Sequence, residues 1–132
     1  MAVKMSVTVR NARVDAIEAS IGASAVLKIR TGAPPTNIAD ADSGAVLATC
    51  SLPTDWMAAA SGGSAVKAGT WQDASADAAG TAGHFRIYAS NGTTQHLQGT
   101  CTGGGDMTLD NYVLAAGQQF TVNTFSVADG NA

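Results

Sequence analysis

The segment HFRIYASNGTTQHLQGTC, residues 84–101, carries the clearest structural signal in the chain. Phe85 and Ile87 alternate with polar residues, and further along Leu97 and Cys101 do the same. Alternation with a period of two is typical of β-strands, and an Asn-Gly pair between two such runs is typical of a hairpin turn. The segment therefore predicts a β-hairpin in which Cys101 shares an apolar face with Leu97.

Further β-patterned runs lie on both sides of this hairpin. The first one ends where Pro34 and Pro35 interrupt it, because proline lacks a backbone N–H and restricts the residue before it. In the last one the apolar phase changes between Val122 and Phe125, which predicts a β-bulge near Asn123. Outside the hairpin, strands are expected at 25–30, 44–50, 65–71, 107–109, 112–114 and 118–127.

One helix is expected, at about residues 6–22. Ser6 can cap its start and Gly22 suits its C-terminal end. Apolar residues recur there at helical spacing, namely Val7, Val14, Ile17 and Ile21. The other faces carry Asn11, Arg13, Asp15 and Glu18. This pattern predicts an amphipathic helix that lies either on the core of its own domain or on another subunit.

These elements predict a mainly β fold, an antiparallel β-sandwich or a small barrel of about seven strands with one N-terminal amphipathic helix. A length of 132 residues corresponds to a single domain, 1–132. Surface scaling gives a folded monomer of this size roughly 6,400 Å² of accessible surface, which leaves a real core.

Composition excludes some classes of partner. Only 13% of the residues are charged, against about 25% in an ordinary soluble domain. Seven Lys and Arg and ten Asp and Glu give a net charge of −3, which lacks the basic footprint of a nucleic-acid-binding protein. Ala, Gly, Ser and Thr must cover much of the surface, and such a surface is suited to packing against other proteins.

The sequence shows no secretory signal and no apolar run of the roughly 20 residues that span a bilayer, so a soluble protein made in the cytoplasm is expected. Its two thiols, Cys50 and Cys101, have neither a CxxC pair nor a zinc-type spacing. Two free, buried thiols are expected, with a late disulfide as the alternative.

Candidate catalytic and metal-binding residues are few. His84 and His96 share the polar face of the hairpin and could lie near each other, but no further ligand completes a metal set, so exposed or structural histidines are expected. The run from Asn37 through Asp40 and Asp42 resembles the start of a calcium loop, but it lacks the closing Glu, so a solvated turn is expected. No nucleophile elbow or phosphate loop occurs. No catalytic, cofactor-binding or metal-binding residue is assigned, and no cofactor is expected.

Arg86 and the two tryptophans point to structural roles. A guanidinium between Phe85 and Ile87 needs a carboxylate or several carbonyl groups, which predicts an ion pair with an Asp. Trp56 and Trp71 are either core residues or anchors of an interface.

Five segments follow one another over most of the chain, namely Asn11–Ile17, Leu27–Pro35, Ala45–Thr49, Gly80–Arg86 and Gln98–Thr100. Together and in this order they resemble a family of small structural proteins of tailed bacteriophage virions. They are structural motifs rather than catalytic ones. Cys50 and Cys101 depart from the pattern, since apolar residues are expected there, so we treat them as small hydrophobic residues.

The resemblance implies a capsid decoration (cement) protein that is not an enzyme. Such a protein binds the assembled shell where capsid subunits meet, commonly as a trimer, and opposes the pressure of packaged DNA through many weak contacts. Its partners would be the major capsid protein or other virion proteins, without direct contact with nucleic acid or membrane. The helix at 7–21 or the Ala/Gly/Ser-rich segment 58–83 would make these contacts.

Two other classes stay open. One is a tail or head-fibre component, or a carbohydrate- or receptor-binding module of the virion, which would need an exposed aromatic platform built from Trp56, Trp71 or Tyr88. The other is a hydrolase, which would need a pocket that unites a histidine with Ser or Asp.

Overall fold

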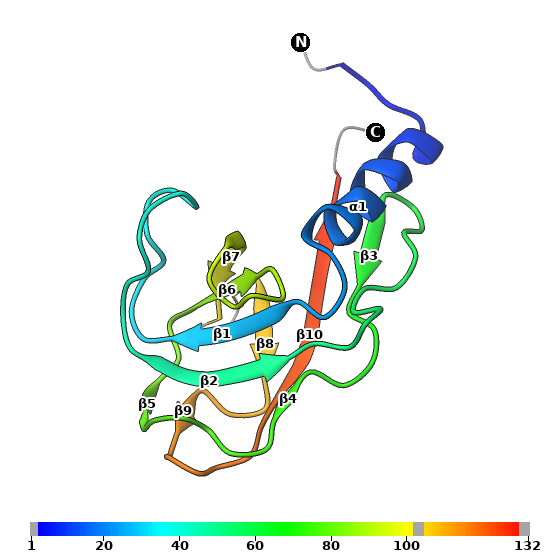
Figure 1. Cartoon of the computed structure of the whole chain (residues 1–132). Coiled ribbons are helices and arrows are strands. Elements are labelled where there is room, and N and C mark those ends of the chain that lie inside the picture. The colour runs from blue at the N-terminus through cyan, green and yellow to red at the C-terminus, as the bar shows by residue number, and fades with distance from the viewer. Residues whose placement is uncertain (1–2, 102–104, 130–132) are drawn as a thin grey trace.

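The hairpin lies inside a four-stranded antiparallel sheet. The computed structural model describes residues 3–101 and 105–129, and the strand order in this sheet is β2-β1-β6-β7 (Figure 1). Phe85 lies opposite Gly99, and Ile87 lies opposite Leu97, as the alternation predicts. The strands are β1 (Val26–Arg30), β2 (Val46–Ser51), β6 (His84–Tyr88) and β7 (Gln95–Thr100).

The long strand β10 (Phe120–Ala128) organises the rest of the fold. It pairs with three short strands along its length, and its register shifts between Val122 and Thr124, which confirms the predicted bulge. A separate two-stranded ribbon lies at the opposite end of the molecule from the helix (Figure 1). The partners of β10 are β3 (Ser64–Val66), β4 (Gln72–Asp73) and β8 (Met107–Leu109), and the ribbon is β5 (Gly80–Thr81) with β9 (Val113–Leu114).

Aromatic rings connect the two main sheets. The ring of Phe85 on β6 meets the ring of Phe125 on β10 edge to face, with their centroids 5.4 Å apart. Phe125 also contacts Trp71 at 5.5 Å, and Trp71 contacts Trp56 at 5.9 Å. Both tryptophans are fully buried, so they are core residues and not interface anchors. Offset and edge-to-face ring pairs stabilise a core beyond the area they bury.

The mainly β class and the single N-terminal helix are confirmed. Within the described residues the sheets stay open, so the barrel alternative is wrong. The accessible surface, 6395 Å², agrees with the value expected from chain length. The strand expected at 65–71 is shorter than predicted, because Gly69 turns the chain with φ +71° and only Ser64–Val66 pairs with β10.

Helix α1 (Val7–Ile21) begins and ends where the sequence predicts. The Ser6 hydroxyl accepts a hydrogen bond from the Val9 N–H at 3.3 Å, and Gly22 ends the helix with φ +98°. Val14 and Ile21 are buried against the core, so α1 closes one end of its own domain.

The polar residues of α1 do not simply face solvent, which corrects the amphipathic picture. Asn11, Asp15 and Glu18 each accept a hydrogen bond from a backbone N–H of the segment 57–63, at 2.6–2.8 Å. They recur at helical spacing, so they form one row along α1. The segment 57–63 is joined by β-bridges to Ser64 and Lys67. The row of polar side chains on α1 covers the other edge of this segment. An uncovered edge would expose unpaired N–H groups and favour aggregation.

Asn11→Ala should lower the free energy of unfolding by about 1–2 kcal/mol, because the Gly63 N–H loses its acceptor in a partly buried site. Urea unfolding followed by circular dichroism measures this change. Thr8→Ala, at an exposed position of the same helix, is the control. Equal losses in both variants would contradict a docking role for the polar row.

Candidate recognition loop

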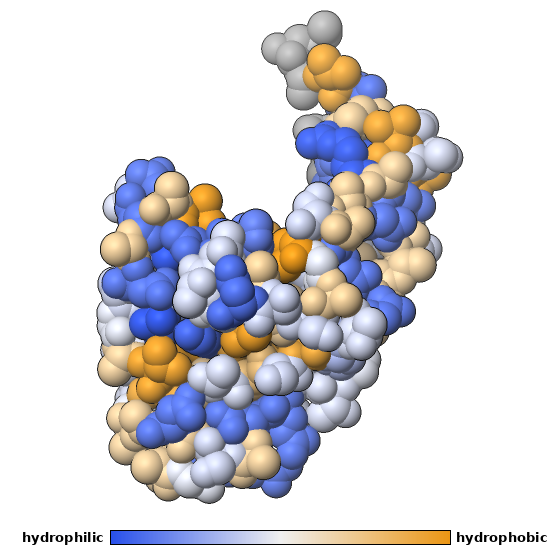
Figure 2. Space-filling model, viewed as in Figure 1, coloured by the Kyte–Doolittle hydropathy of each residue, from blue (hydrophilic) through white to orange (hydrophobic). Residues whose placement is uncertain are grey.

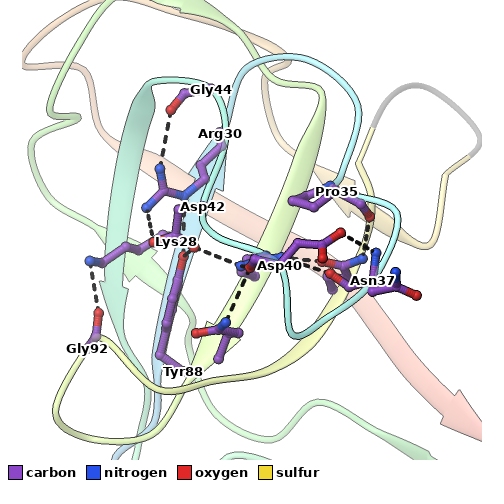
Figure 3. A network of polar contacts seen from close by, with 12 residues as sticks. Lys28, Arg30, Pro35, Asn37, Asp40, Asp42, Gly44, Tyr88 and Gly92 are labelled. Atoms are coloured by element: carbon purple, nitrogen blue, oxygen red, sulfur yellow. Dashed lines mark hydrogen bonds and ion pairs between the residues drawn. The ribbon is translucent and has the colours of Figure 1, made fainter.

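The connection between β1 and β2 is the most distinctive feature of the surface. Residues 31–45, here called the anchored loop, contain no helix or strand and project beside the first sheet (Figure 1). Loops of this length without secondary structure are uncommon in compact domains and are usually functional or disordered. This loop is held from below by side chains of the sheet, as Figure 3 shows.

Arg86 provides more of these bonds than any other side chain, from the middle of β6, where its side chain is 0% exposed. The Nη1 atom of its guanidinium donates to the carbonyl of Asp40 and to the carboxylate of Asp42, both at 2.9 Å. Nη2 donates to the carbonyl of Asn37 at 3.3 Å, and Nε donates to the side chain of Gln98 at 3.0 Å. The predicted ion pair between Arg86 and an Asp is therefore confirmed, and carbonyl groups complete the set.

Asp42 is the acceptor that three side chains of the sheet share. Arg30 contacts its carboxylate at 3.0 Å, and the Tyr88 hydroxyl donates to it at 2.7 Å. Burial by itself would raise the pKa of Asp42, but the hydrogen bonds from Tyr88 and Arg86 and the charges of both arginines outweigh burial and lower that pKa below 3.8. Asp42 therefore stays ionised at neutral pH and compensates two buried cations.

His84 ties the other end of the loop. Its ring is buried, and Nδ1 donates to the carbonyl of Gly32 at 2.9 Å. Burial lowers the pKa of His84 below 6.5, and the charges of Arg30 and Arg86 lower it further, so the ring is neutral at pH 7. Its Nε2 has no hydrogen-bond partner within residues 3–101 and 105–129.

The two histidines do not form a pair. His84 lies opposite Thr100 at one end of the hairpin, whereas His96 is exposed near the other end. The hairpin's polar face is also not a solvent face, because the anchored loop covers it and all of β6 is buried. Spacing alone could not reveal this, since alternation is the same whether the second face meets water or a loop.

Residues 37–44 form an exposed turn, as the sequence predicts, and the structure adds that this turn is bonded to the sheet. Its carbonyl groups and Asp42 point toward the sheet, while the Asp40 carboxylate accepts from the Asn37 N–H at 2.9 Å. The outer side chains remain exposed, and among them Ile38 is a large apolar residue with 37% exposure. The position of Arg86 between two apolar residues indicates that it needs an acidic partner. Nothing in the local sequence pattern identifies Asp42 as that partner.

The remaining candidates belong to the core. Trp56 and Trp71 donate to the carbonyls of Gly22 and Ala68, and Tyr88 is buried below Asp42, so these three aromatics form no exposed platform. Cys50 and Cys101 are buried and free, as expected. Burial raises the pKa of each thiol to about 12, so both behave as small hydrophobic residues.

Nearly all charged side chains bond within the chain. Of the seven basic and ten acidic residues, all except Lys4 and Asp55 donate to or accept from another group of the described residues. Asp73 and Asp110, for example, accept from the backbone N–H groups of Thr49 and Thr121. Most of the charge that the chain has is therefore bonded within it, and the carboxylates that accept from backbone N–H groups keep their negative charge at the surface.

Comparisons with protein-family models, with curated proteins and with solved structures found no match. Residues 3–101 and 105–129 include no helix that is long and apolar enough to cross a membrane. The same residues contain no group of three or more His, Cys, Asp and Glu that could hold a metal ion.

Arg86→Met should lower the free energy of unfolding by about 3–5 kcal/mol, because removal of one partner leaves buried polar groups uncompensated. Hydrogen exchange should also become faster at the amides of Asn37 and Asp40. Lys28→Met is the matched control, since Lys28 bonds to Gly92 outside the loop. Similar exchange rates in the two variants would show that Arg86 does not hold the loop.

Acidification should destabilise the protein in a window set by His84. Because its pKa is lower in the folded state, the unfolded chain takes up the proton first, so stability is complete above pH 6.5 and is lost as pH falls through the folded pKa. Thermal unfolding at several pH values measures this loss. His84→Asn should flatten the profile in this window, whereas His96→Asn should leave it unchanged. A wild-type profile flat below pH 6.5 would contradict the role of His84.

Proposed function

We propose that this chain is a structural protein of a bacteriophage virion, a capsid decoration (cement) protein that stabilises the head by protein–protein contacts. In this proposal it is made in the cytoplasm of the bacterial host and resides on the capsid surface. Its partners are the major capsid protein or other virion proteins, and it acts as a homo-oligomer, with a trimer favoured. Its role is to bind, without a catalytic step and without contact with nucleic acid or membrane.

The observation that carries the proposal is the anchored loop. A loop that is ordered before binding loses less conformational entropy when it binds, so more of the contact energy appears as affinity. Arg30, Arg86 and His84 are buried at the expense of desolvation, and what they hold is a loop with an exposed outer side. This arrangement supports recognition of another protein through the loop.

The distribution of charge gives a second line of support. A net charge of −3 with only seven Lys and Arg residues gives no positive field that would steer nucleic acid to the surface. Figure 2 shows hydrophilic and pale residues interrupted by small hydrophobic patches, with a hollow between the anchored loop and α1. Such a surface fits repeated contacts with a protein lattice, where many weak contacts add up through multivalency.

Sites on α1 and on the segment 58–83 remain candidates for further contacts. Val7 and Val9 are about half exposed on the first turn of α1, and Val66 is exposed on β3. A tail or head-fibre component would use the same kinds of surface, so the location in the particle distinguishes it from a decoration protein. No observation favours glycan binding, because Trp56, Trp71 and Tyr88 are buried.

Binding to shells of the phage that encodes the chain should depend on the outer side of the loop and little on salt. Ile38→Asp should weaken co-sedimentation with expanded shells by about tenfold, the usual size of a hot-spot effect. An increase from about 0.1 M to about 1 M salt should change binding through Ile38 little, because that contact is apolar and salt screens only charged groups.

Val113→Asp, an equally apolar exposed site on β9 at the other end of the molecule, is the control and should bind normally. Cryo-electron microscopy of purified particles tests the location directly. Density for this chain on the head lattice is the expected result. Density on the tail would select the fibre alternative, and absence from the particles would overturn the proposed function.

A further inference from the structure

Two charged side chains stand apart from the internal network. Lys4 and Asp55 have no hydrogen-bond or ion-pair partner among the described residues, whereas every other charged side chain has one. They carry opposite charge and both are exposed. Because the other charged side chains bond within the chain, Lys4 and Asp55 are the candidates for a contact with another molecule.

Lys4 lies on an arm that extends from the start of α1. Residues 3–6 have no regular structure and point away from the body (Figure 1). Val3, next to Lys4, is 78% exposed, the highest value among the large apolar residues of the described chain. The arm therefore presents one apolar and one cationic side chain to solvent.

Asp55 lies at a hollow of about 250 Å³ between α1 and the segment that precedes β3. Val14, Met57 and Ala65 form an apolar, almost inaccessible floor. Asp15, Glu18 and Asp55 place three carboxylates at its edge, and Asp55 is the one whose two oxygens accept no hydrogen bond from the described residues. The hollow thus matches the arm in both respects, with an apolar floor and an acidic edge.

We propose that the arm of a second copy of this chain occupies this hollow, with Val3 on the floor and the Lys4 ammonium paired with Asp55. The lysine stem can lie along apolar surface while its charged end reaches the edge. The inference rests on the self-association that is part of the proposed function, and it names the surfaces involved. Repeated around a closed ring, this head-to-tail contact produces a symmetric oligomer.

The arm of the same chain cannot fill the hollow without rearrangement. Met5 contacts the Arg13 side chain on one side of α1, with Sδ and Nη1 3.1 Å apart. Asp15 lies two residues further on, about 200° around a helix with 3.6 residues per turn, so the hollow faces the other side. The Ser6 cap also directs the chain away from the helix at this point.

A charge-reversal cycle tests the contact. Sedimentation velocity of the purified full-length chain over a range of concentrations should show an oligomer for the wild type. Lys4→Glu and Asp55→Lys should each raise the dissociation constant by about tenfold or more, because like charges across an interface repel. The double variant Lys4→Glu/Asp55→Lys should recover most of the wild-type affinity, and Val113→Glu should have no effect.

Salt gives an independent signature. Screening should weaken this self-association between about 0.1 M and 1 M salt, unlike the binding to shells. A monomer at all concentrations, or single variants that associate like the wild type, would overturn the inference. Shell binding by a monomeric variant would leave the proposed function standing, and self-association without shell binding would remove the proposed function alone.

Cross-linking provides a second measurement that does not depend on repulsion. A mixture of the Lys4→Cys and Asp55→Cys variants under mild oxidation should form a covalent heterodimer on a non-reducing gel. Cys50 and Cys101 should stay unreactive, because burial raises each thiol pKa to about 12. Cross-linking no faster than for a mixture of Lys4→Cys and Val113→Cys would contradict the arm-in-hollow contact.

Discussion

The guanidinium of Arg86 sets conditions that the surrounding structure must meet. It lies in the central part of the first sheet, between Phe85 and Ile87, where an unpaired cation would be very unfavourable. The carboxylate of Asp42 and the carbonyls of two loop residues must therefore lie above β6. This requirement turns a long connection into an ordered surface and buries the second face of the hairpin.

Charged side chains elsewhere in the molecule are also bonded to groups of the same chain. In the polar row of α1, Asp15 and Glu18 accept hydrogen bonds from backbone N–H groups of residues 57–63. Arg13 is paired with Asp129, next to the end of β10. A low proportion of charged residues thus does not mean a weakly bonded fold. It means that charge is placed where backbone groups need partners, and that contacts with other molecules must rely on shape, small residues and isolated apolar side chains.

The sequence pattern predicts this structure best where the residues that form an element are close together in the chain. The hairpin, the capped helix and the bulge in β10 each depend on residues within one short stretch of sequence. Each lies close to its predicted position. It failed where the middle of the chain depends on distant partners. The strand at Ser64–Val66 stops early because Gly69 turns the chain, and alanine-rich sequence carries little preference that could indicate this.

By itself the sequence determined the mainly β class, the position of the helix, the burial of both thiols and the need of Arg86 for an acidic partner, because these follow from periodicity, capping and desolvation. Only the tertiary structure decided that this partner is Asp42, 44 residues away along the chain. It also decided that His84 lies under the anchored loop and that Lys4 and Asp55 have no partner in the part of the chain that the structure describes. The physical reason is that alternation defines which side chains share a face, whereas the element that covers the face is chosen by packing between segments far apart in the chain.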